Sequence, residues 1–146
     1  MLNEMIGTGL AQRYEELGAK VAELAGPLSN EQFWRKPFTF GNSFGHLVLH
    51  LTGNLNYYIG TEVAGTGYVR DRDREFNEAA RPPKGEVLKR FGDAVAMVAQ
   101  TARLQAEKDW SAPYTALGEK TAGNRFDVFL RCATHLHHHV GQMTYL

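Results

Sequence analysis

The sequence predicts an all-α protein in which four helices pack into a bundle. Four stretches of the chain carry apolar residues at steps of three or four, which is the repeat of one helix face. Connections rich in glycine, proline or charge separate these stretches, and no stretch alternates apolar and polar residues as a half-buried strand does. A helix cannot bury its apolar stripe alone, so we expect all four to pack antiparallel. The length of 146 residues fits one domain over residues 1–146.

The first helix is expected over residues 3–25. Gly26 and Pro27 follow its last apolar positions, and this pair typically ends a helix. Ser29 is then a favourable N-cap for a short helical turn that runs through Trp34. The apolar stripe of the long helix consists of Ile6, Leu10, Tyr14, Leu17, Val21 and Leu24.

The second helix is expected over residues 43–60, with Asn42 or Ser43 as its N-cap. Residues 60–82 then form a long connection that is rich first in glycine and afterwards in charge. Two consecutive prolines close this connection and suit the entry to the next helix. We therefore expect residues 60–82 to lie outside the helical framework.

The third helix is expected over residues 84–106 and the fourth over residues 124–145, because both stretches repeat the stripe pattern. Residues 107–122 lie between them and contain Trp110, Pro113 and two glycines. We interpret this segment as a loop with room for a short extended piece. The sequence does not contain an internal repeat or a low-complexity tract that would suggest another architecture.

The composition of the chain argues against two classes of partner, nucleic acids and membranes. Lysine plus arginine and aspartate plus glutamate each number 16, so the formal net charge is zero, and we expect no nucleic-acid partner. No apolar run approaches the roughly 20 residues of a membrane-spanning helix, so we expect no membrane partner. Cys132 is the single cysteine, which excludes an internal disulfide. With an N-terminus that lacks a signal-peptide pattern, this favours a cytoplasmic protein.

The six histidines fall in only two places, residues 46–50 and 135–139. On a helical wheel, His135 and His139 lie on the apolar face of the fourth helix, one turn apart. His50 also faces inward on the second helix, whereas His46 lies toward the edge of that face. Two histidines at i and i+4 can bind one metal ion, and a third from a facing helix would leave coordination positions open. The sequence therefore indicates a candidate catalytic metal site.

Each of these residues also has a simpler interpretation. A lone inward histidine is more often a hydrogen-bonded core residue, and Cys132 is best interpreted as a small buried core side chain. His46 favours a place at the surface or beside the site. Asn54 and Gln142 are candidates to hold a ligand or a bound water. Three arginines of the long connection are candidates to bind a substrate carboxylate, although a charged loop is more often only solvated; they are Arg70, Arg72 and Arg74.

Two motifs resemble the DinB/YfiT-like superfamily: HLVLHLTGNL in the second helix and H-x-x-x-H-x-G-Q in the fourth. The stretches SNEQFWRKP and DRDREF resemble a common bacterial branch of it. The resemblance spans roughly residues 29–142. It implies a four-helix bundle with a three-histidine site for a divalent metal, usually zinc or nickel. Matched residue by residue, the metal ligands are His50, His135 and His139. The resemblance also implies a homodimer, and zero net charge offers no electrostatic bar to self-association.

Some members of this family are transferases or isomerases that use a low-molecular-weight thiol, and others have no known activity. The first functional hypothesis is therefore a metal-dependent S-transferase whose metal lowers the pKa of a thiol cofactor and holds its thiolate. No residue of the chain identifies that thiol or the small-molecule substrate. The alternatives are a non-catalytic metal-binding or stress-related protein, and a metal-dependent hydrolase. We expect no inward Glu or Asp beside the three histidines, which counts against hydrolysis.

Overall fold

The computed structural model describes residues 2–77, 79–116 and 122–146. Within these residues, strand structure is limited to one isolated bridge between Pro113 and Asn124. The helical elements are, in chain order, α1 (Leu2–Ala25), α2 (Asn30–Trp34), α3 (Phe44–Leu55), the π-helix η1 (Asn56–Ala64), α4 (Arg72–Asn77), α5 (Lys84–Leu104), α6 (Glu107–Trp110) and α7 (Arg125–Met143).

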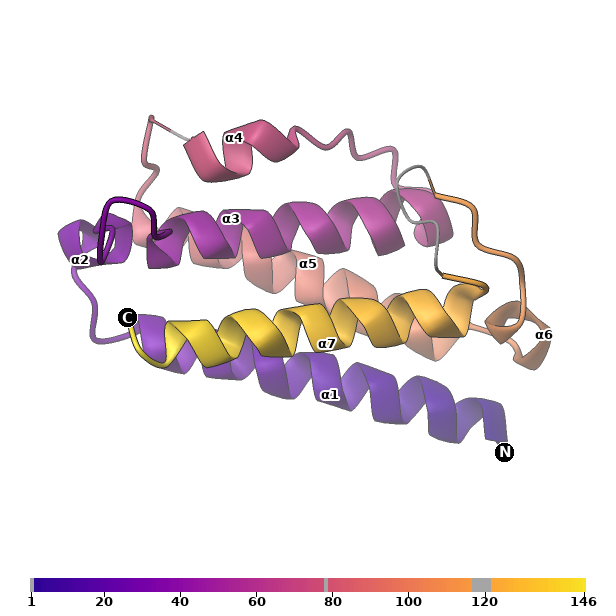
Figure 1. Ribbon diagram of the computed structural model, residues 1–146. Helices are drawn as coiled ribbons and strands as arrows, with labels where there is room; N and C mark the ends of the chain where they lie inside the picture. Colours follow the sequence, from indigo (N-terminus) through magenta and orange to yellow (C-terminus); the bar gives the residue numbers. More distant parts are fainter. Residues whose placement is uncertain (1, 78, 117–121) are drawn as a thin grey trace.

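Four long helices, α1, α3, α5 and α7, lie side by side as a bundle (Figure 1). α1 packs against α5 and α7, and α3 packs against the same two helices. Their predicted apolar stripes meet in the core, where Tyr14, Leu51, Val98 and Phe129 are fully buried. The predicted all-α four-helix bundle is thus confirmed, with helix ends within two residues of those expected for α1, α5 and α7. None of the described helices is both long enough and apolar enough to cross a membrane.

The second long helix differs from its prediction. The α-helical part ends at Leu55, and the chain continues as a π-helix to Ala64. The wider turn is marked by the hydrogen bond that the backbone N–H of Gly65 donates to the carbonyl of Gly60, five residues earlier. Gly65 then adopts a left-handed conformation with φ of 71° and ends the helix, as glycine readily does. Apolar spacing could not predict this change, because a π-turn leaves little trace in the periodicity.

Two short helices occupy segments that were predicted to be connections. α4 lies within residues 60–82, and α6 within residues 107–122; residues 117–121 of the latter segment lie outside the described residues. Each has six residues or fewer, which is too short for an apolar stripe to emerge from the sequence. α4 packs along α3 and is drawn above it in Figure 1. This contact brings part of the charged connection onto the helix that carries His50.

Candidate metal centre

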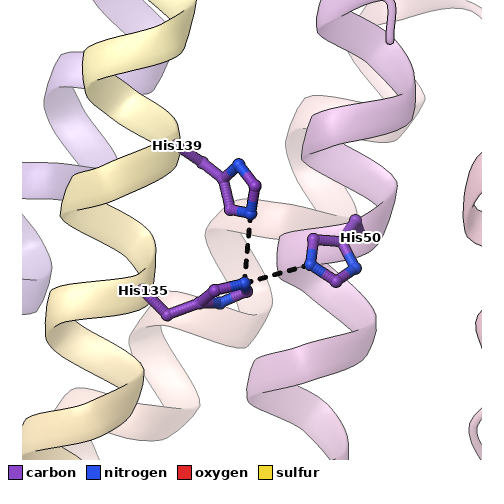
Figure 2. Close-up of side chains that lie close together, drawn as sticks. All are labelled: His50, His135 and His139. Atoms are coloured by element: carbon purple, nitrogen blue, oxygen red, sulfur yellow. Dashed lines mark hydrogen bonds between the residues drawn. The ribbon is translucent and has the colours of Figure 1, made fainter. Parts of the chain in front are cut away.

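Three histidine side chains from two facing helices converge on one point (Figure 2). The Nε2 atom of His135 lies 3.1 Å from Nε2 of His50 and 3.1 Å from Nε2 of His139. Tetrahedral zinc with Zn–N bonds of 2.0–2.1 Å places its nitrogen ligands about 3.3 Å apart. Two of the three nitrogen separations are therefore close to those of a metal-binding set, and all three ligand atoms lie within 4.8 Å of one another. Among the described residues, this trio is the cluster of His, Cys, Asp or Glu side chains that could hold a metal ion.

The helices explain why these three side chains meet. His135 and His139 are one turn apart on α7, so both project from the same face of that helix. His50 projects from α3, which packs against α7. All three lie where the helical wheel places them, facing the partner helix.

Burial keeps the α7 histidines neutral. It lowers the pKa of His135 to about 3, and the neighbouring His139 and His50 rings add to the effect. Burial also lowers the pKa of His139, although its contact with Gln142 acts in the opposite direction. A neutral imidazole is the form that offers a lone pair to a metal ion. At neutral pH, both side chains of α7 are therefore ready to act as ligands without first losing a proton.

The remaining ring nitrogens have three different environments. Nδ1 of His50 lies 3.0 Å from Oε1 of Glu75, and Nδ1 of His139 lies 2.6 Å from Oε1 of Gln142. Both oxygens are acceptors, so each Nδ1 carries the proton and leaves the Nε2 lone pair facing the shared point. Nδ1 of His135 is buried and has no hydrogen-bond partner within the part of the chain that the structure describes.

Glu75 is a buried carboxylate beside the cluster, and the expectation of no inward acidic residue is wrong. Only 6% of this residue is exposed. Arg70 donates to both carboxylate oxygens, at 2.8 Å and 2.9 Å, while His50 donates to one of them. Burial raises the pKa of the Glu75 carboxyl, but the hydrogen bonds from His50 and Arg70 outweigh it and leave that pKa below its usual value. Glu75 therefore stays ionised.

Gly53 provides the space for this carboxylate. A Cβ atom at position 53 would lie 1.8 Å from Oε2 of Glu75, which is far inside contact distance. The glycine of the HLTGN motif therefore permits α4 to rest its acidic side chain directly on α3, one turn from His50. Glu75 was missed because it lies in a short helix without periodicity. The one available signal was the DRDREF motif, which supported the family resemblance but gave no place in the fold.

The structure separates the three arginines that were candidates for binding a carboxylate. Arg70 is held by Glu75, and its side chain is only 10% exposed. Arg72 lines a cavity of about 270 Å³ beside the histidines, which also touches His50 and His135. Arg74 lines a different cavity, between α3, α4 and α5. Of the three, only Arg72 is an exposed side chain that borders the cavity next to the candidate metal centre.

His46 is buried, with only 3% of its surface exposed, so a surface position is wrong. Its Nδ1 lies 2.6 Å from the hydroxyl of Ser43, and its ring packs edge-on against Trp34. The wheel placed it at the edge of the inward face, but α2 covers that edge. His46 is not part of the three-histidine cluster.

The other polar candidates lie as follows. Asn54 is buried on α3 and lines the cavity beside His50 and His135. Gln142 contacts His139 as described above. Cys132 is buried, as predicted, and also borders that cavity. His137 and His138 are exposed on α7.

Comparison with known families agrees with the motifs. A family model described as the DinB superfamily matches residues 13–143, which is most of the chain and includes all three histidines. No curated protein matches the chain.

The histidine pKa values predict how acid affects the metal-free protein. An unfolded histidine titrates near 6.5, whereas folded His135 titrates near 3, so the unfolded state binds more protons between these values. His135 therefore leaves the free energy of unfolding unchanged above pH 6.5 and lowers it as the pH drops toward 3. Allowing for partial exposure, we expect His135 to contribute a loss of about 1 kcal/mol by about pH 5.

Urea unfolding in the presence of a chelator measures this loss. His135→Leu should flatten the pH dependence between pH 6.5 and about pH 5, because it removes the group that titrates. His137→Leu, on the exposed side of the same helix, should keep the wild-type slope. Equal slopes in all three proteins would contradict the assignment.

Proposed function

The chain belongs to the DinB superfamily, and from that premise we propose that His50, His135 and His139 bind one divalent metal ion, zinc or nickel, in a thiol-dependent transferase. The observation that carries this proposal is the convergence of three Nε2 atoms beside a cavity. Imidazole nitrogen is a common ligand for both metals. Three protein ligands leave at least one position to a substrate, which is the catalytic rather than the structural pattern.

The residues around the ligands support a preformed site. Glu75 holds His50 through Nδ1, and Gln142 holds His139 in the same way. Such partners fix the tautomer and the ring orientation of a ligand histidine. Arg70 balances the charge of Glu75. The three histidines and the residues that hold them therefore bring no excess negative charge to the candidate metal centre. When bound there, a divalent metal supplies a positive charge that lowers the pKa of a thiol and favours its thiolate.

The cavity favours an enzyme over a protein that only stores or senses a metal. Its volume of about 270 Å³ lies directly against two of the three histidines. A ligand in it would sit next to the coordination position that the histidines leave open. A metal held only for stability would instead be enclosed by a fourth protein ligand.

Metal-dependent hydrolysis is less well supported, although a carboxylate does lie beside the histidines. A general base needs a free lone pair directed at the attacking water. Both oxygens of Glu75 already accept hydrogen bonds from Arg70 and His50, and its lowered pKa makes it a weak base. Glu75 is therefore suited to positioning His50 rather than to accepting a proton from water.

The expected homodimer stays a prediction.

Metal content tests the ligand assignment. His50→Ala, His135→Ala and His139→Ala should each lower the zinc or nickel retained after dialysis well below one ion per chain, because two imidazoles hold these ions poorly. His137→Ala should retain the wild-type content, since its side chain is exposed outside the cluster. Elemental analysis of untagged protein measures the ratio. The assignment fails if His46→Ala loses the metal while His50→Ala keeps it.

Glu75→Gln tests the positioning role. The amide keeps the shape of the side chain but loses its charge and one strong acceptor, so metal affinity should fall about 10- to 100-fold. Asp73→Asn makes the same chemical change at an exposed position of α4 and should leave the affinity unchanged. Competition with a chromogenic chelator measures both constants. An unaltered affinity in Glu75→Gln would show that this carboxylate serves only the fold.

Thiol binding tests the activity class. Binding of 2-mercaptoethanol should require the metal and release close to one proton at neutral pH, because a free thiol has a pKa of about 8.5 and the bound form is the thiolate. Calorimetry in two buffers of different ionisation enthalpy gives the proton count. His139→Ala should abolish the binding, whereas His137→Ala should not. Binding that is independent of the metal, or that releases no proton across a panel of small thiols, would refute the thiol mechanism.

A further inference from the structure

The cavity beside the three histidines has a one-sided charge. Among the described residues that line it, three are arginines, and none is acidic; the arginines are Arg70, Arg72 and Arg131. Glu75 neutralises Arg70 from outside the cavity, and Asp127 pairs with Arg131 at 3.3 Å. Arg72 has no carboxylate within 4.0 Å in the described part of the chain; its guanidinium lies over the ring of Phe76. One positive charge on the rim is therefore without an acidic partner among these residues.

The same cavity contains a polar group that lacks a partner. Asn54 is 9% exposed, and its Oδ1 makes no hydrogen bond in the part of the chain that the structure describes. A buried amide oxygen without a donor is costly, and turning the amide over would present this oxygen to an N–H or O–H group in the cavity. Asn54 lies one helical turn beyond His50, so this group would stand next to the candidate metal centre.

Size limits what can enter. A volume of about 270 Å³ is just below the usual range for small-molecule pockets, which begins at about 300 Å³. Tyr58 and Val128 line the end of the cavity farthest along the two helices from His50 and His135. This space has room for a small organic molecule, or for one short arm of a larger one.

We infer that this cavity binds a small organic carboxylate, with its negative charge against Arg72 and a polar group near Asn54. Arginine pairs well with carboxylates because its planar fork of donors matches their two oxygens. The inference rests on the proposed function in one respect: the reacting end of the ligand points to the three histidines. It adds the charge of the ligand, which the proposed thiol chemistry leaves open.

Three thiols that share the stem HS–CH₂–CH₂– separate charge from thiol chemistry. They are 3-mercaptopropionate, which is anionic, 2-mercaptoethanol, which is neutral, and cysteamine, which is cationic. Calorimetry with zinc-loaded protein at low salt should show the anion binding about fivefold more tightly than the neutral thiol, as expected for a favourable ion pair at a solvent-exposed rim. Cysteamine should bind most weakly. The preference should shrink at about 1 M salt, where charges on the rim are screened.

Arg72→Gln is the decisive variant, and Arg74→Gln is its matched control on the same helix. Arg72→Gln should bring the ratio of the two affinities close to one, because it weakens the binding of the anionic thiol. Arg74→Gln should keep the wild-type ratio, because Arg74 borders a different cavity. Equal affinities for the anionic and neutral thiols in the wild type, or a preference that survives Arg72→Gln, would overturn the inference while the proposed function stands.

If zinc-loaded protein binds none of the thiols, the proposed function fails, and a ligand without sulfur decides the inference. Succinate is then titrated against the metal-free protein while the side-chain amide resonances of Asn54 are followed by NMR. A saturable shift that is lost in Arg72→Gln supports the carboxylate site. No shift in the wild type, or the same shift in the variant, overturns it.

Discussion

The buried carboxylate of Glu75 is the interaction on which the arrangement of this site depends. A buried charge is tolerated only when it is paired and hydrogen-bonded, and Glu75 obtains its partners from two other segments of the chain. Arg70 comes from the connection before α4, and His50 comes from α3. Satisfying one carboxylate thus fixes α4 against the bundle and sets the direction of a candidate ligand. Gly53 permits the contact between Glu75 and α3, because a larger side chain at this position would occupy the place of the carboxylate oxygen.

The three candidate ligands differ in how strongly their neighbours fix the orientation of each ring. His50 is 6% exposed and has a charged partner that is itself buried. His139 has a neutral amide partner on the exposed side of α7, whereas Nδ1 of His135 has no partner in the described structure, and this ring contacts only the other two histidines through Nε2. His50, on α3, is therefore the candidate ligand whose orientation is most strongly fixed. The two rings of α7 are the ones with freedom to adjust to the coordination geometry of a bound ion.

Sequence periodicity was sufficient for the framework because the four stripes are long and one-sided. It also oriented the three histidines, since a side chain on a regular helix points in a direction that the residue number alone determines. It failed where regular geometry ends. Glu75 lies in a helix of six residues, and the π-helix after Leu55 changes the angle per residue. The burial of His46 depends on coverage by Trp34, which is a tertiary contact between segments that periodicity treats separately.

The proposed metal site and the inferred carboxylate site share one short segment of the chain, residues 70–76. Arg70 and Glu75 form the ion pair that orients His50, and Phe76 packs its ring against that histidine at 4.8 Å between centroids. Arg72, which lies over Phe76, borders the cavity. A ligand that draws Arg72 toward the cavity therefore acts on a helix whose other side chains touch His50. Any shift of α4 that strains the contact between Glu75 and His50 costs hydrogen-bond energy, so the inferred carboxylate site would favour anions that reach Arg72 without moving α4. If the cavity binds a carboxylate as inferred, Glu75 would in this way restrict the length of that ligand as well as its charge.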